Sequence, residues 1–192
     1  MVASLSTTGP CGQRGSSMIE VLVTLVIVSF GLLGLAGLQT RLQTSEMEAY
    51  QRSQALMLLN DMANRIGANR GNAASYVTTA ANPLGANITC PTATTSIVQR
   101  DLREWCNALQ GAGETTGSSN VGAMIGGRGC VENLGSGVFF ITVAWQGLTP
   151  ISAPPTAVAC GAGSYNGASG SSCDDDLCRR TVTTLVRIAT LI

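Results

Sequence analysis

The side chains best placed to do chemistry near the start of the chain are a carboxylate and the glycine ahead of it. Glu20 is the only charged residue in the apolar run from Met18 to Leu38, and Gly15 ends a short polar leader just before that run. An ionised carboxylate in hydrocarbon costs about 2–4 kcal/mol, so an acid at this position calls for a cationic partner. The alternative is that the Glu20 side chain only reaches out to the membrane surface.

Cysteines are the second group of reactive side chains. Of the seven cysteines, Cys11 lies in the leader and the other six follow the apolar run: Cys90, Cys106, Cys130, Cys160, Cys173 and Cys178. An even set in a Gly/Ser-rich region, without histidine and without C-x-x-C pairs, indicates disulfides in an oxidising compartment rather than zinc ligands. Six cysteines allow 15 connectivities. Only the short loop between Cys173 and Cys178 suggests a particular pair.

The usual patterns of enzymes and of nucleic-acid-binding proteins do not occur in the sequence. There is no histidine, no G-x-S-x-G and no phosphate-binding loop, so nothing brings together a nucleophile, a base and oxyanion donors. Arginines and acids balance, and only Arg179 and Arg180 are adjacent, so no basic stripe for nucleic acid is expected. The sequence predicts a non-enzymatic protein without cofactor, bound metal or nucleic-acid partner.

The apolar run predicts a membrane anchor that stays attached. From Met18 to Leu38 it is long enough to cross a bilayer, which takes about 20 apolar residues. A secretory signal has its cleavage site after the hydrophobic stretch, whereas Gly15 comes before it. Arg14 favours a cytoplasmic N-terminus, and the cysteines favour an oxidising compartment for everything after about residue 40. We therefore expect a single-pass membrane protein whose head, after about residue 40, is periplasmic or extracellular; the resemblance described below implies the inner membrane and a periplasmic head.

Two helices and a small antiparallel sheet are expected. The first helix should run from Ser16 to Ile66, half in lipid and half amphipathic, with one apolar stripe on the head: Leu42, Ala49, Leu56, Leu59, Ala63 and Ile66. A short helix is expected within 95–111, ending near Gly111. Strands are expected in GVFFITVAWQG (137–147), in RRTVTTLVRIATL (179–191) and, less extensively, in GCVENL (129–134). The expected fold class is α+β.

The head should have a modest core and long loops. Trp105, Phe139, Phe140 and Trp145 are interpreted as core residues. In the strand 137–147, Phe139, Ile141, Val143 and Trp145 occupy one face. The segments 78–95 and 149–172 are rich in Pro, Gly, Ser, Thr and Asn and are read as loops. A head with so much loop needs cross-links, which contribute typically about 2–4 kcal/mol each.

The N-terminal sequence G-SSMIE-VLVTLVIVSFGLLGLAGL resembles that of type IV prepilins and pseudopilins. Three features coincide: the cleavage glycine, the carboxylate at the fifth mature position and the uncut membrane helix. The resemblance covers residues 9 to about 66. Further along, the VFFITVAW strand, the cysteines and the terminal VTTLVRIATL are similar to the minor pilin subgroup called pilus modification protein PilV.

The resemblance implies a processing pathway and a domain layout. Prepilin peptidase would cut after Gly15 on the cytoplasmic face and then N-methylate the new amino group of Ser16. Glu20 would attract the Ser16 amine of a neighbouring subunit as subunits leave the membrane for the filament. The layout is then a leader (1–15), a transmembrane and filament-core helix (16–40) and a periplasmic pilin-like head that includes the amphipathic half of the helix (41–192). The family usually has Phe where this chain has Ser16.

The resemblance implies a structural function: a minor pilin that joins or primes type IV pilus assembly, with inner-membrane lipid, the major pilin and other minor pilins as partners. Its final location would be the pilus filament at the cell surface. A close alternative is a minor pseudopilin of type II secretion. A different class is a filament-tip adhesin or a partner of one, in which Asp174, Asp175 and Asp176 would offer oxygen ligands to calcium. Three adjacent acids lack the alternating spacing of calcium loops, so a solvated turn is favoured.

Overall fold

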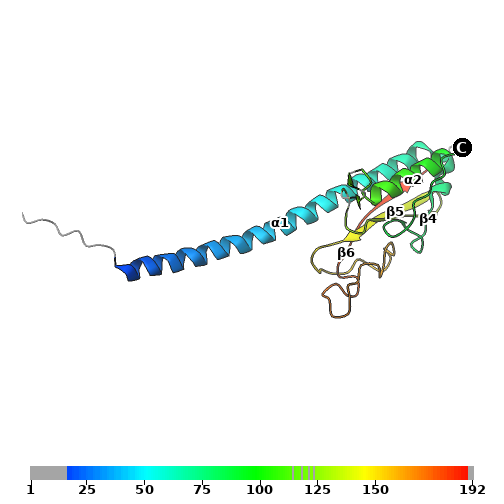
Figure 1. Cartoon of the computed structure of the whole chain (residues 1–192). Coiled ribbons are helices and arrows are strands. Elements are labelled where there is room, and N and C mark those ends of the chain that lie inside the picture. The colour runs from blue at the N-terminus through cyan, green and yellow to red at the C-terminus, as the bar shows by residue number, and fades with distance from the viewer. Residues whose placement is uncertain (1–16, 114, 118, 121, 123, 190–192) are drawn as a thin grey trace, which may run out of the picture. The chain divides into compact units, whose positions relative to one another are not determined.

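The computed structural model describes residues 17–113, 115–117, 119–120, 122 and 124–189. The chain divides into two units, with the boundary between Gln43 and Thr44. Figure 1 shows one long helix, α1 (Met18–Ala68), to which both units contribute, and a set of strands near its C-terminal half. The predicted helix and α+β class are therefore confirmed. Ser16, the expected first helical residue, lies outside the described part of the chain.

The face that α1 buries in the second unit differs from the predicted stripe. Its buried residues follow each other at intervals of three or four: Gln51, Ala55, Leu59, Met62 and Ile66. Of the predicted stripe, Leu59 and Ile66 are buried and Ala63 packs against the core, whereas Leu42, Ala49 and Leu56 are exposed. A seven-residue interval drifts by about 20° per repeat around a straight helix. The predicted stripe used the seven-residue spacing of Leu42, Ala49, Leu56 and Ala63. It therefore moved away from the buried face of the helix.

The second helix, α2 (Ile97–Leu109), begins at a complete capping box. The Ser96 hydroxyl accepts a hydrogen bond from the backbone N–H of Gln99, and the Gln99 side chain accepts one from the backbone of Ser96. The helix ends before Gly111, which has φ of 73°. A 3₁₀ helix, η1 (Arg70–Tyr76), follows α1 and was not predicted.

The sheet has four antiparallel strands in the order β1-β4-β5-β6. They are β1 (Leu84–Gly85), β4 (Arg128–Gly135), β5 (Val138–Gln146) and β6 (Arg179–Arg187). The last three contain the predicted strands. β1 is a two-residue strand inside a segment read as loop. A separate pair, β2 (Thr115–Thr116) and β3 (Ser119–Asn120), was also not predicted.

The two faces of the sheet are covered differently. On one face Phe139, Ile141, Val143 and Trp145 join the core formed with α1 and α2, which confirms that they share a face and that Phe139 and Trp145 are core residues. Trp105 of α2 is fully buried there, and its indole N–H donates to the carbonyl of Leu58 on α1 at 2.9 Å. Phe140 points to the other face and is only half buried, so its assignment to the core was wrong.

Candidate functional site

The part of α1 in the first unit presents apolar side chains all round. Between Met18 and Leu42 the large apolar residues are 48–87% exposed, as for Val21 at the lower end and Met18 at the upper end. An 18-residue window has a mean hydropathy of 2.6 and no buried residue. Among the described residues, α1 is the one helix long and apolar enough to cross a membrane. A helix that is apolar on every side requires an apolar environment.

The hydroxyl groups of this segment are satisfied within the helix. Thr24, Ser29 and Thr40 each donate to a backbone carbonyl three or four residues earlier, at 2.9, 2.7 and 3.1 Å. In lipid no water is present to pair with such hydroxyls, so local pairing lowers the cost of placing them there. The segment therefore offers lipid a surface with few unmet polar groups.

Glu20 lies in the first turn of α1, where a negative side chain interacts favourably with the helix dipole. The helix starts just before it, since the backbone N–H groups of Glu20 and Val21 donate to the carbonyl of Ser17 at 2.9 and 3.3 Å. Glu20 and Arg41 are the charged residues between Met18 and Gln43. Gly15 and Ser16, the predicted cleavage and methylation positions, lie outside the described residues.

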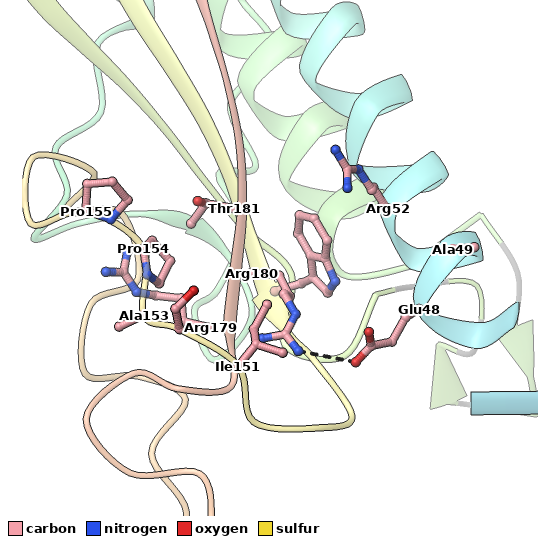
Figure 2. A pocket seen from close by; sticks show the side chains of 12 residues that line it. Glu48, Ala49, Arg52, Ile151, Ala153, Pro154, Pro155, Arg179, Arg180 and Thr181 are labelled. Atoms are coloured by element: carbon pink, nitrogen blue, oxygen red, sulfur yellow. Dashed lines mark hydrogen bonds and ion pairs between the residues drawn. The ribbon is translucent and has the colours of Figure 1, made fainter. Parts of the chain in front are cut away.

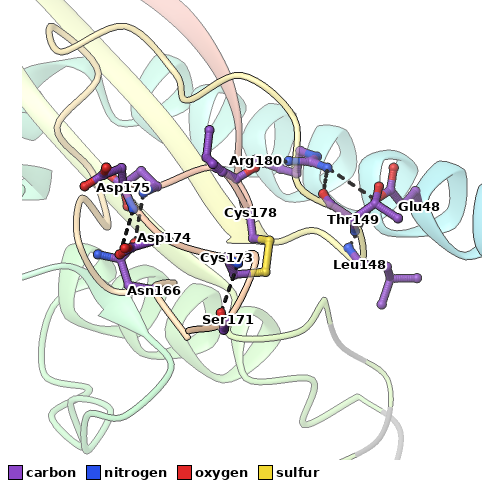
Figure 3. Close-up of a disulfide and its surroundings, with 12 residues drawn as sticks. Glu48, Leu148, Thr149, Asn166, Ser171, Cys173, Asp174, Asp175, Cys178 and Arg180 are labelled. Atoms are coloured by element: carbon purple, nitrogen blue, oxygen red, sulfur yellow. Dashed lines mark hydrogen bonds and ion pairs between the residues drawn. A yellow bond between two sulfur atoms is a disulfide. The ribbon is translucent and has the colours of Figure 1, made fainter. Parts of the chain in front are cut away.

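The head carries three disulfides, in agreement with the prediction that the six cysteines are paired. Cys90–Cys106 ties a loop to α2, with Cα atoms 5.6 Å apart. Cys130–Cys160 ties β4 to the segment between β5 and β6, with Cα atoms 5.9 Å apart. Cys173–Cys178, the one pair that its spacing suggested, closes a short turn before β6 (Figure 3). All three lie in the second unit.

The 149–178 segment covers the face of the sheet opposite the helices. Thr142 and Ala144 are fully buried on that face. Cys160 lies against the carbonyl of Thr142, and Gly161 approaches the side chain of Ala144 so closely that an added Cβ would be 3.4 Å from it. The segment has no helix or strand of its own, so the Cys130–Cys160 bond is a main attachment of it to the sheet.

Glu48 of α1 binds the start of the β5–β6 connection and the start of β6. One carboxylate oxygen, Oε1, accepts hydrogen bonds from the backbone N–H groups of Leu148 and Thr149, at 3.1 and 3.3 Å, and forms an ion pair with Arg180 at 3.3 Å (Figures 2 and 3). Burial alone would raise the pKa of Glu48, but the Leu148 hydrogen bond and the Arg180 charge outweigh it and lower that pKa. Sequence reasoning missed Glu48. The only signal was the adjacent arginine pair.

The three acids before β6 do not act as a group. Asp176 accepts from the backbone N–H of Gly163 at 2.8 Å and pairs with the buried Arg179 at 3.1 Å. Arg179 also donates to the carbonyl of Val158 at 2.6 Å. Asp174 and Asp175 are exposed. No group of three or more His, Cys, Asp or Glu side chains in the described part of the chain is arranged to hold a metal ion. The geometry gives Asp176 a structural role in the loop.

A second ionic cluster joins α1 to α2. The guanidinium of Arg65 pairs with Asp61 at 2.9 Å and with Asp101 and Glu104 at 2.8 Å each. The Tyr76 hydroxyl donates to Asp101. Burial and this hydrogen bond raise the pKa of Tyr76. The cluster is partly exposed and is made of structural contacts between neighbouring elements.

Comparison with protein families gives two matches. Residues 11–36 match the prokaryotic N-terminal methylation motif, and residues 37–114 match the family described as type IV pilin Tt1218. No curated protein and no solved structure matches the chain. The two matched ranges adjoin, so the methylation motif continues directly into the pilin domain along α1. Over residues 11–114 the chain is therefore similar to type IV pilins.

Proposed function

We propose that this chain is a minor pilin of the PilV kind, which primes or joins type IV pilus assembly in a tip complex with other minor pilins. The observation that carries the proposal is the direct passage from the methylation motif into the pilin domain through one helix. A subunit built in this way keeps its anchor after its leader is removed. Its head then provides the lateral surface for contacts with other subunits.

The proposed processing creates the charge that Glu20 requires. Prepilin peptidase cuts after Gly15, frees the amino group of Ser16 and methylates it. That amine keeps its positive charge. An ionised carboxylate in hydrocarbon costs about 3 kcal/mol, and an ammonium partner removes much of this cost. Removing one member of such a buried pair leaves the other charge unpaired and costs about 3–5 kcal/mol. Glu20 therefore favours neighbouring subunits whose axial position in the filament brings their Ser16 amine beside it.

The proposed topology follows from the same elements. Residues 1–15 are the leader, 16–40 the membrane and filament-core helix, and 41–192 the head. The N-terminus is cytoplasmic and the head periplasmic, which the three disulfides of the second unit support because disulfides persist in oxidising compartments. The partners are then inner-membrane lipid before assembly, and the major pilin, other minor pilins and a tip adhesin afterwards.

The first test is the mass and N-terminal sequence of the protein recovered from sheared filaments. We expect a chain that begins at Ser16 and carries one added methyl group. The leader still attached to filament protein would refute the processing step. Copurification with secretion-system subunits in place of pilins would instead assign the chain to a type II pseudopilus.

The second test is Glu20→Ala, with Glu46→Ala as the matched control, because Glu46 is an exposed acid on the same helix beyond the apolar segment. We expect Glu20→Ala to be cleaved normally but to enter filaments at least about tenfold less often, since 3 kcal/mol corresponds to more than a factor of 100. Glu46→Ala should enter normally. Equal incorporation of the two variants would exclude the charge-pairing role of Glu20.

A further inference from the structure

The strand β6 has an open edge. It is the last strand in the sheet order, and β5 is its one partner among the described strands. The β5–β6 register is regular from Val138↔Arg187 to Gln146↔Arg179. Hydrogen bonds at both ends show which residue pairs of the ladder are hydrogen-bonded. The Gly147 N–H donates to the carbonyl of Cys178 at 2.7 Å, and the Ile188 N–H donates to the carbonyl of Gly137 at 2.8 Å.

The position of the hydrogen-bonded pairs determines which backbone groups of β6 face away from β5. In an antiparallel pair, hydrogen-bonded and non-hydrogen-bonded residues alternate. Even-numbered residues from Arg180 to Val186 therefore bond to β5. The N–H and C=O groups of four odd-numbered residues point to the open edge: Thr181, Thr183, Leu185 and Arg187. Of these, Thr183, Leu185 and Arg187 are exposed, with Leu185 at 59%. An exposed edge of this length is a template for another strand.

A cavity lies at the start of this edge (Figure 2). It measures about 560 Å³ and lies between α1, the beginning of β6 and the 151–155 segment; its lining includes Arg52, Thr181, Ile151 and Pro155. Leu56 is one turn beyond Arg52 on α1, on the same side, and is 42% exposed. A strand added to β6 would therefore have an apolar side chain and a cation of α1 above it.

The charges along the edge are unbalanced. Arg179 and Arg180 are paired with Asp176 and Glu48. Arg52 at the cavity and Arg187 at the far end of β6 make no ion pair with any residue that the structure describes. Thr181, which lines the cavity together with Arg52, is six strand residues from Arg187, roughly 20 Å at 3.3 Å per residue. β6 itself contains no acid.

We propose that the open edge of β6 docks an extended, acid-flanked segment of another pilus subunit, which adds a fifth strand to the sheet. Backbone hydrogen bonds to the four outward-facing residues give affinity, and carboxylates near Arg52 and Arg187 set its direction and register. That the partner is a pilus subunit rests on the proposed function. The strand addition itself does not.

A second copy of this chain fits the edge less well. β6 contains no acid, so a second β6 strand laid along this edge would bring no carboxylate to Arg52 or Arg187. At the other edge of the sheet, β1 and the Thr78–Val131 bridge already occupy much of β4. The charge pattern therefore favours an acidic partner over a homodimer.

The test uses the full-length protein in detergent micelles and a capped octapeptide of alternating valine and threonine with glutamate at both ends. The control peptide has lysine at both ends. Hydrogen–deuterium exchange is read residue by residue. With the acidic peptide at about ten times its Kd, exchange should slow about tenfold at Thr183, Leu185 and Arg187. The lysine peptide should leave these rates unchanged.

Two sets of variants locate the interaction. Thr183→Pro removes one outward-facing N–H without breaking the ladder to β5, and should abolish protection by the peptide; Thr183→Ala keeps the N–H and should not. If the proline variant fails to fold, as judged by loss of native circular dichroism, Arg52→Glu and Arg187→Glu serve instead. Each substitution should weaken binding of the acidic peptide at least about tenfold and strengthen binding of the lysine peptide.

The proposal is overturned if the acidic peptide gives no protection up to about 1 mM, or if both peptides protect equally. Protection that rises with protein concentration without peptide would assign the edge to a second copy and also overturn it. These outcomes are independent of the filament test, because a correctly cleaved and methylated pilin could still fail to bind the peptide. Loss of methylation would leave the peptide result unaffected.

Discussion

Gly129→Ala should destabilise the head, because Trp105 occupies the space into which the new methyl group would point. Gly129 lies on β4, and a Cβ built there falls within 2.7 Å of three atoms of the Trp105 ring. Trp105 is fully buried and donates its indole N–H to Leu58 on α1. The ring therefore has little freedom to move: shifting it away from β4 disturbs the contact that joins α2 to α1.

The magnitude follows from two terms. Overpacking a well-filled core costs about 1–3 kcal/mol, and losing the indole hydrogen bond costs about 1 kcal/mol more. We therefore expect the free energy of unfolding to fall by about 2–4 kcal/mol. At about 2–4 °C per kcal/mol for a chain of this size, Tm should fall by roughly 5–15 °C.

The assay is thermal unfolding of the full-length protein in detergent, followed by near-ultraviolet circular dichroism. Gly67→Ala is the matched control: it lies in α1, and an added Cβ meets nothing within 4 Å, so it should be neutral or stabilise by up to about 1 kcal/mol. In the Trp105→Phe background the penalty of Gly129→Ala should shrink by at least half. A change below about 0.5 kcal/mol in the native background would show that the ring moves freely.

Two further predictions concern the attachment of the loops. Glu48→Gln should lower stability by about 1–2 kcal/mol near neutral pH, because it removes a charge-assisted set of hydrogen bonds. Since the folded-state pKa of Glu48 is lowered from 4.5, this contribution is present above pH 4.5 and disappears as the pH falls through the lowered pKa. The free energies of unfolding of the native and variant proteins should therefore converge at low pH. A difference in stability that stays constant with pH would contradict this. Replacing each disulfide by a pair of serines should cost most for Cys130–Cys160 and least for Cys173–Cys178. Their sequence separations of 30 and 5 correspond to about 3.6 and 2 kcal/mol of loop-closure entropy. The losses of stability are to be measured by denaturant unfolding. The reverse order would show that strain or unfolded-state structure dominates.

The local features of this protein follow from short-range sequence patterns. The apolar run predicts the first part of α1 because its side chains, apart from that of Glu20, are compatible with lipid. Ser96 and Gln99 mark the start of α2 because a capping box satisfies free backbone N–H groups using only neighbouring residues. The alternation in β5 predicts which residues share a face, because successive side chains of a strand point to opposite sides, but it left open which face is the core. The type IV pilin signature is of the same kind, since Gly15, Ser16 and Glu20 lie within six residues.

Features that join distant residues depend on the tertiary structure. Glu48 contacts Leu148, Thr149 and Arg180 only because α1 lies beside the β5–β6 connection, and nothing in the spacing of these residues indicates it. The partners of Cys130 and Cys90 likewise depend on which loop lies against β4 and which lies against α2. The core face of α1 is set by the sheet and by Trp105, which select Gln51, Ala55 and Met62 over the apolar but exposed Leu42 and Leu56. Sequence fixes what a side chain can do within a turn or two, whereas long-range packing decides which of several amphipathic faces is buried.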